Sequence, residues 1–186
     1  SGMGRWAKVM DRWARVSVLT PRRAVNLLQL SVSYRTAKRS GQPQMPPNVM
    51  PTSLSIEPTT SCNLRCPECP SGLRSFTRPT GMLNVDHAYR WIDELAPWLT
   101  YVNLYFQGEP LLHPKLDQLI AQCHRHGIYS STSTNAHHLT EAKCHALIDA
   151  GLSRLIVSID GLTQETYASY RVGGTLTKVM EGTRNM

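Results

Sequence analysis

From residue 53 onward, short strand patterns alternate with helical patterns at regular spacing. We predict strands at residues 53–57, 101–107, 128–134 and 154–160, and helices at 84–95, 114–126 and 140–150, followed by a helical turn near 164–170 and a helix from Thr175. Alternation at this spacing indicates parallel strands that are joined by right-handed crossovers. The sequence therefore restricts this part of the 186-residue chain to an α/β architecture.

The predicted strands carry apolar side chains at every second position. Val102, Leu104 and Phe106 alternate with polar residues in the second strand, and the first and fourth strands show the same pattern. Successive side chains of a strand point to opposite faces, and a parallel sheet that is buried on both faces normally has continuous aliphatic strands. One face should therefore pack on helices while the other lines a wet space.

The third predicted strand is the most polar, because residues 130–134 all carry hydroxyl groups and lead to Asn135. An incomplete barrel with helices outside and a hydrophilic lumen accounts for this pattern, whereas a closed eight-stranded barrel filled with aliphatic side chains does not. The alternative is four strands of an open, doubly wound sheet.

The excess positive charge belongs to the N-terminal part of the chain. The net charge is +7, and residues 1–40 contain nine Lys or Arg against the single acid Asp11. We predict a basic arm of two amphipathic helices over residues 1–48, followed by a second domain at 49–186, with Thr20-Pro21 beginning the second helix. The Trp6/Trp13 stripe favours packing on the globular core, and contact of residues 1–40 with an anionic membrane surface is the less favoured alternative.

The cysteine count and the hydropathy indicate a cytoplasmic protein. No apolar run approaches the roughly 20 residues that cross a bilayer, and the pattern of a signal peptide is missing from the N-terminus. Five cysteines cannot all form disulfides with one another, which fits a reducing compartment. Cys123 and Cys144 fall on apolar helical stripes, where a thiol behaves as a small hydrophobic group.

Cys62, Cys66 and Cys69 directly follow the first predicted strand with the spacing C-x3-C-x2-C. Three thiolates on one loop can bind three irons of a 4Fe-4S cluster and leave the fourth iron with open coordination positions. Zinc is the competing metal, although zinc sites favour C-x2-C pairs at both ends and this segment contains no histidine.

Two further motifs, Gln107-Gly108-Glu109-Pro110 and Ser158-Ile159-Asp160-Gly161, end the second and fourth predicted strands. Together with the cysteine loop they resemble the radical S-adenosylmethionine superfamily over residues 50–186. The run from Glu57 to Pro70 is most similar to the branch with a C-terminal SPASM extension. The resemblance implies an α/β fold, a partial (β/α)6 TIM-like barrel with four of its six strands and an N-terminal helical arm, whose C-terminal part is absent from this sequence.

The resemblance also implies which residues bind the cofactors, a 4Fe-4S cluster and S-adenosylmethionine. It implies that the cluster is bound by Cys62, Cys66 and Cys69. The residues implied to contact S-adenosylmethionine are Gly108 and Glu109 at the methionyl ammonium, Ser158 and Asp160 at the ribose or methionyl carboxylate, Arg171 at that carboxylate, and Asn135. Two positions depart from the family pattern: Glu68 stands where an aromatic residue is common, and Gln107 replaces a glycine.

The implied reaction is reductive cleavage of S-adenosylmethionine to a 5'-deoxyadenosyl radical that abstracts hydrogen from a peptide or protein. A small metabolite of cofactor biosynthesis is the alternative substrate, and a non-catalytic metal-binding fragment is the alternative function. The implied partners are the substrate and a reductant such as flavodoxin or ferredoxin, with no nucleic acid. Of the remaining polar residues, His137, His138 and Glu57 could contact substrate, while the simpler interpretation gives them structural roles, and His113 should shape the helix entry at Pro114.

Overall fold

The computed structural model of the protein describes residues 14–42 and 48–186. The elements follow in the order α2 (Pro21–Ser40), β1 (Ser53–Ser55), α3 (Pro70–Leu73), α4 (Val85–Leu95), β2 (Tyr101–Asn103), the 3-10 helix η1 (Pro110–Leu112), α5 (Leu116–Arg125), β3 (Tyr129–Thr134), α6 (Glu141–Asp149), β4 (Arg154–Val157), α7 (Gln164–Tyr170) and α8 (Leu176–Asn185). The predicted alternation of strands and helices is therefore confirmed. No helix in the described residues is both long enough and apolar enough to span a membrane.

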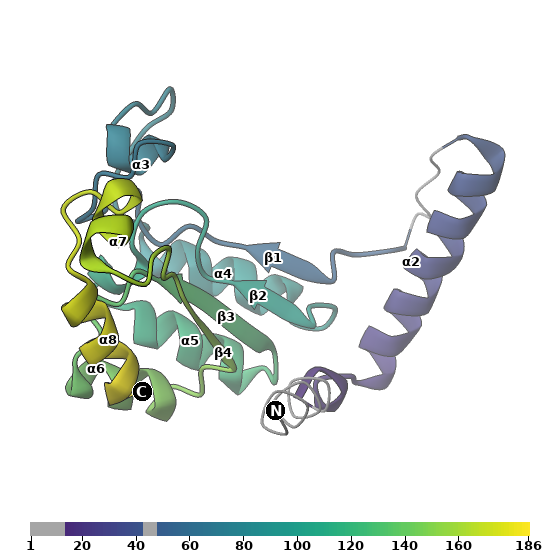
Figure 1. Cartoon of the computed structure of the whole chain (residues 1–186). Helices are drawn as coiled ribbons and strands as arrows, with labels where there is room; N and C mark the ends of the chain where they lie inside the picture. The colour runs from purple at the N-terminus through teal and green to yellow at the C-terminus, as the bar shows by residue number, and fades with distance from the viewer. Residues whose placement is uncertain (1–13, 43–47) are drawn as a thin grey trace, which may run out of the picture.

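The four strands form one parallel sheet in the order β1-β2-β3-β4 (Figure 1). Leu54 of β1 lies opposite Val102 of β2, and Thr132 of β3 lies opposite Leu155 of β4. Each crossover leads to the neighbouring strand, without the reversal of strand order that defines a doubly wound sheet. The fold is the partial barrel that the sequence predicted.

One face of the sheet is apolar and packs on helices. Val102 and Leu104 are fully buried in a core that Ile92 of α4 and Leu119 and Ile120 of α5 complete. The opposite face is polar: the Ser131 hydroxyl donates to Asn103 Oδ1 at 3.0 Å and also shares a hydrogen bond with the hydroxyl of Tyr101. These contacts agree with the predicted hydrophilic lumen.

Hydroxyl groups of β3 also point toward the helices, because Ser130 and Thr132 share the face of Val102 and Leu155. The Thr132 hydroxyl donates to the Leu104 carbonyl at 2.9 Å, which satisfies a buried polar group locally. The Ser130 hydroxyl is buried without a hydrogen-bond partner. Strand β3 is thus polar on both faces, and its last core-facing hydroxyl, that of Thr134, reaches the candidate site.

The strands are shorter than predicted, and the end of the second predicted strand differs in kind. Strand β2 stops at Asn103, and the Phe106 side chain is 70% exposed instead of lying on the buried face. The helix predicted at 114–126 begins at Leu116, after η1. His113 lies at this junction as predicted, with Nε2 3.0 Å from the Leu83 carbonyl and Nδ1 accepting the Lys115 amide at 3.2 Å.

The predicted start of α2 is confirmed, since the Thr20 hydroxyl accepts the Arg23 amide and Pro21 occupies the first turn. The predicted apolar face is wrong for this helix: its two buried side chains, Arg23 and Asn26, are polar, whereas Leu28 is 65% exposed. Much of α2 stands apart from the sheet in Figure 1. Trp6 and Trp13, on which the predicted stripe of the first helix rests, lie outside the described residues.

Candidate cofactor site

Residues 59–71, here called the three-cysteine loop, are bound to the turn that follows β2. The Glu109 amide donates to the Ser61 carbonyl at 2.7 Å, and the Gly108 amide donates to the Ser71 hydroxyl at 2.8 Å. Gly108 has φ +74°, and a Cβ atom there would lie 2.2 Å from the Thr59 carbonyl oxygen. Only glycine combines this backbone conformation with so close an approach, so Gly108 brings the two motifs into contact.

A cavity of about 240 Å³ opens between this loop and the carboxyl ends of the strands. Eight of the nine residues that the sequence assigned to cofactors line this cavity: Cys62, Cys66, Cys69, Gly108, Glu109, Asn135, Ser158 and Arg171. Tyr105, Phe106 and Tyr170 add aromatic side chains to its wall. Ligands of open α/β sheets bind outside the carboxyl ends of the strands, which is where this cavity lies.

Glu109 is the most deeply placed charged group of the cavity, with 2% of the residue exposed. Its Oε1 accepts the Thr134 hydroxyl at 2.7 Å and the Leu111 amide at 3.1 Å, while Oε2 accepts the Asn135 amide at 2.8 Å. Burial raises the pKa of this carboxyl group, and the three hydrogen bonds oppose that shift. Because a carboxylate has about four acceptor sites, Oε2 retains capacity for one more donor.

Two of the three cysteine sulfurs, those of Cys62 and Cys66, have N–H groups beside them. Arg171 Nη1 lies 3.8 Å from Cys66 Sγ, Asn135 Nδ2 lies 3.9 Å from Cys62 Sγ, and the Leu64 amide donates to Cys62 Sγ at 3.4 Å. Burial raises the pKa of both thiols, whereas the Leu64 amide lowers that of Cys62 and the Arg171 guanidinium lowers that of Cys66. Burial is the larger effect, and these neighbours oppose it by favouring the thiolate form, which is the form that binds metal.

Asp160 is the one predicted residue outside the cavity lining. Its carboxylate forms an ion pair with Arg171 Nε, and its side chain is 43% exposed. Asp160 therefore contacts Arg171, and Arg171 in turn contacts Cys66. The Ser158 hydroxyl, in contrast, lies in the cavity wall 3.4 Å from the Ser133 hydroxyl.

The donor set fits a 4Fe-4S cluster with a small polar ligand beside it. Three soft thiols, two of them with N–H donors beside their sulfurs, are typical of iron–sulfur sites. No three His, Cys, Asp or Glu side chains of the described residues are grouped closely enough to bind one metal ion, but a cubane does not require this since each thiolate binds a different iron. Gln107 Oε1, buried in the cavity wall without a partner, offers an acceptor to a ligand.

Two other candidate residues have structural partners. Glu57 pairs with Arg78 and accepts the Gln107 amide at 3.2 Å, so it ties the end of β1 to the turn after β2. His137 accepts the Thr175 amide on Nε2 at 2.9 Å at the start of α8. Both agree with the simpler of the two interpretations that the sequence allowed.

The two remaining cysteines, Cys123 and Cys144, are buried in the hydrophobic core, as predicted. Burial raises the pKa of the Cys123 thiol to about 12. Both thiols therefore behave as small hydrophobic groups and are separate from the three thiols that line the cavity.

Sequence reasoning missed several residues that support the site. Ser71 accepts the Gly108 amide, Thr134 donates to Glu109, and Asn63 Oδ1 accepts the Asn135 side-chain amide at 2.9 Å. The position of Ser71 two residues after Cys69 was the only available signal, because serine and threonine are common in loops for many reasons.

Comparison with known proteins agrees with the fold. The pattern of the Radical SAM superfamily matches residues 56–186. The chain is 34% identical over 121 residues to an AdoMet-dependent heme synthase from Methanosarcina barkeri, covering 65% of this chain and 34% of that protein. It is 32% identical over 126 residues to a PqqA peptide cyclase from Rhodopseudomonas palustris, covering 67% of this chain and 32% of that protein.

Solved structures show the same fold at lower identity. Native anSMEcpe with bound AdoMet superposes with a TM-score of 0.61 at 23% identity, over 73% of this chain and 40% of that one. Streptococcus suis SuiB bound to the precursor peptide SuiA superposes with a TM-score of 0.60 at 16% identity, over 82% of this chain and 33% of that one.

A parallel α/β partial barrel with three cysteines at the carboxyl ends of its strands defines an iron–sulfur protein of the S-adenosylmethionine-binding class. The chain belongs to the Radical SAM superfamily, whose members use a 4Fe-4S cluster and S-adenosylmethionine. Its relatives include SPASM-type enzymes. The chain spans about one third of the length of the curated relatives it matches.

Proposed function

We propose that this chain is the N-terminal part of a radical S-adenosylmethionine enzyme that modifies a peptide or protein. The observation that carries the proposal is that Cys62, Cys66, Cys69 and Glu109 line one cavity. When bound, the cluster would supply the electron that cleaves S-adenosylmethionine reductively and generates a 5'-deoxyadenosyl radical.

The residues of this chain would hold and orient the two cofactors. The three thiolates would bind three irons, and the second lone-pair site of Glu109 Oε2 would accept the methionyl ammonium, a charge-assisted contact. Gln107 Oε1, which lacks a partner, would accept a second hydrogen from the same ligand. The Ser158 hydroxyl would contact its ribose or carboxylate. Because Glu109 is only 2% exposed, little water would compete for its contact with the ammonium.

The substrate class rests on the relatives, which divide into two groups. Peptides appear in the names of the PqqA peptide cyclases and of the SuiB complex with SuiA. Small molecules are indicated by the AdoMet-dependent heme synthase and by a GTP 3',8-cyclase. The resemblance of residues 57–70 to the SPASM branch favours the first group. A flavodoxin or ferredoxin reductant and a cytoplasmic location remain predictions.

Anaerobic reconstitution with iron and sulfide, followed by absorption and EPR spectroscopy, tests the metal assignment. Replacement of Cys62, Cys66 or Cys69 by alanine should abolish the 4Fe-4S signal, while Cys123→Ala and Cys144→Ala should retain it because these thiols are buried in the core. Stoichiometric zinc in the wild-type protein, with no iron uptake, would overturn the proposal in favour of a metal-binding module.

Activity is tested on the reconstituted protein with S-adenosylmethionine and dithionite, by measuring 5'-deoxyadenosine. The expected result is cleavage that depends on all three cluster cysteines and is weakened by Glu109→Gln. Cluster formation without any cleavage in a chain extended to the length of its relatives would contradict an enzymatic role.

A further inference from the structure

Arg171 is fixed between an acid and a cluster cysteine. It follows α7, where its amide donates to the Tyr167 carbonyl at 2.8 Å. Asp160 binds its Nε, which directs Nη1 toward Cys66 Sγ at 3.8 Å. The side chain is only 20% exposed. Two of its guanidinium nitrogens thus have partners, and its positive charge lies beside the Cys66 sulfur in the cavity wall.

Asn135 makes the corresponding contact with a second cysteine. Its side-chain amide lies 3.9 Å from Cys62 Sγ and donates to Asn63 Oδ1 at 2.9 Å, while its backbone amide donates to Glu109. The residue is 4% exposed, and its contacts with Cys62, Asn63 and Glu109 fix its orientation. Two of the three cysteine sulfurs therefore each have a side-chain N–H group beside them.

We propose that Arg171 and Asn135 raise the reduction potential of the cluster held by Cys62, Cys66 and Cys69, by placing N–H groups on the sulfurs of Cys66 and Cys62. The inference rests on the proposed function, because it requires that these cysteines bind a 4Fe-4S cluster. The contact between Arg171 and the methionyl carboxylate that the sequence resemblance implied stays a separate prediction, because the proposal concerns the cluster in the absence of S-adenosylmethionine.

The physical reason is the change of charge on reduction. Uptake of one electron from an external donor adds one negative charge to a site that already contains three thiolates. A cation or N–H donor beside a sulfur stabilises the more negative state more strongly, particularly where little water screens the interaction. Arg171 should have the larger effect since it carries a full charge, and Asn135 the smaller since it contributes a dipole.

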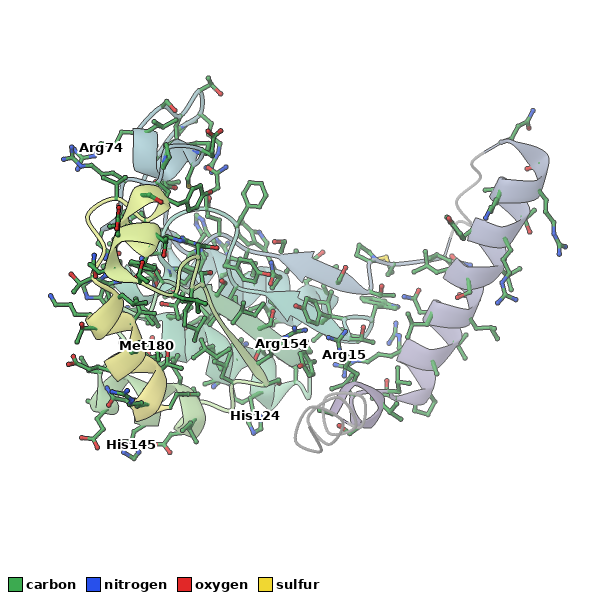
Figure 2. All side chains as sticks on the ribbon, in the orientation of Figure 1. Arg15, Arg74, His124, His145, Arg154 and Met180 are labelled. Atoms are coloured by element: carbon green, nitrogen blue, oxygen red, sulfur yellow. The ribbon has the colours of Figure 1, made fainter. Side chains whose placement is uncertain are left out.

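The test is an anaerobic redox titration of the reconstituted protein with dithionite, followed by EPR in the absence of S-adenosylmethionine. Arg171→Gln should shift the midpoint to a more negative potential, Arg171→Lys should shift it less because the charge is kept, and Asn135→Ala should give a smaller negative shift. Arg154→Gln is the matched control, because Arg154, which Figure 2 labels, begins β4 at the opposite end of the strand from the cavity. Its midpoint should equal that of the wild type.

An unchanged midpoint in Arg171→Gln would overturn the inference. If that variant also bound S-adenosylmethionine more weakly in calorimetry, the methionyl carboxylate would be the partner of Arg171 after all. If Arg171→Gln takes up no iron, the test rests on Arg171→Lys and Asn135→Ala. Midpoint potentials equal to that of the wild type in both variants would then overturn the inference. Failure of the wild-type protein to form any 4Fe-4S cluster would instead reject the proposed function on which the inference rests.

Discussion

The Glu109 carboxylate lies beside the carboxyl ends of β2 and β3, and its three hydrogen-bond partners are all donors: the Thr134 hydroxyl and the amides of Leu111 and Asn135. A glutamine at this position would turn its NH2 group toward at least one of these donors. We therefore expect Glu109→Gln to lower the free energy of unfolding by about 1–3 kcal/mol, the cost of a buried polar group left unsatisfied. Urea denaturation of the cluster-free protein measures this loss.

Glu94→Gln is the control for that experiment, because Glu94 is an exposed residue of α4. This change should leave stability within about 0.5 kcal/mol of the wild type. Equal stability of the two variants would mean that the Glu109 carboxylate acts only on a ligand and does not support the fold.

Cys123 provides a pH-dependent prediction. Burial raises the pKa of its thiol to about 12 in the folded protein, against an ordinary value of 9.0. Because the folded-state pKa is the higher one, the contribution to stability is full below pH 9 and is lost as pH rises from about 9 toward 12. Between pH 8 and pH 10.5 the free energy of unfolding should fall by about 2 kcal/mol through this group.

Chemical denaturation of the wild type and Cys123→Ala at the two pH values measures this contribution. The variant loses packing at both pH values, so only the difference in pH dependence counts. A wild-type protein whose stability follows the same pH profile as Cys123→Ala would show that the thiol ionises freely in the folded state.

At the scale of elements, Arg23 joins α2 to the ends of two helices of the barrel. Its guanidinium donates to the Ala96 carbonyl after α4 at 2.9 Å and to the carbonyls of His126 and Gly127 after α5 at 2.8 and 2.6 Å. Carbonyl groups at helix C-termini carry partial negative charge, so a cation suits this position. One buried side chain thus satisfies carbonyl groups of two helices.

Arg23→Ala should lower the free energy of unfolding by roughly 3 kcal/mol, because buried carbonyls lose charge-assisted hydrogen bonds. Arg22→Ala is the matched control: Arg22 stacks on the Trp98 ring at 4.5 Å and is exposed, so its loss should cost about 0.5–1 kcal/mol. Thermal unfolding compares the two variants, and equal losses would refute the anchoring role of Arg23.

At the scale of the whole molecule, the side-chain hydrogen bonds that join α2 to the barrel within residues 14–42 and 48–186 all come from its first half. Arg23 and Asn26 hold that half to the barrel. Asn26 does so through paired hydrogen bonds with the Met50 backbone at 2.9 Å. Beyond them Val32 is 55% and Tyr34 70% exposed. The second half of α2 therefore depends mainly on its own helix propensity.

Hydrogen exchange should show this unequal stability in the chain. Amides of residues 32–39 should exchange far faster than those of residues 119–123 in α5, whose side chains are largely buried. Local opening costs little where few apolar contacts break. Similar protection of the two segments would indicate that α2 is covered by a second molecule in solution.

Local patterns in the sequence determined much of this structure. Thr20-Pro21 placed the start of α2, alternating apolar residues placed Val102 and Leu104 on the core side, and cysteine spacing brought three thiols to one loop. Each of these depends on residues close together in the chain, where backbone geometry and side-chain periodicity leave few alternatives.

The tertiary structure alone decided which distant groups meet. Arg23 pairs with carbonyls 73, 103 and 104 residues away, Arg171 lies beside Cys66 at a separation of 105 residues, and Phe106 leaves the core because β2 ends early. Such contacts depend on how the crossovers arrange the strands and helices. The residues next to an arginine or phenylalanine in the sequence do not indicate which distant groups it will contact. The periodicity of the sequence specifies which face of a strand or helix a side chain occupies, whereas the packing of the whole chain specifies which residues lie against that face.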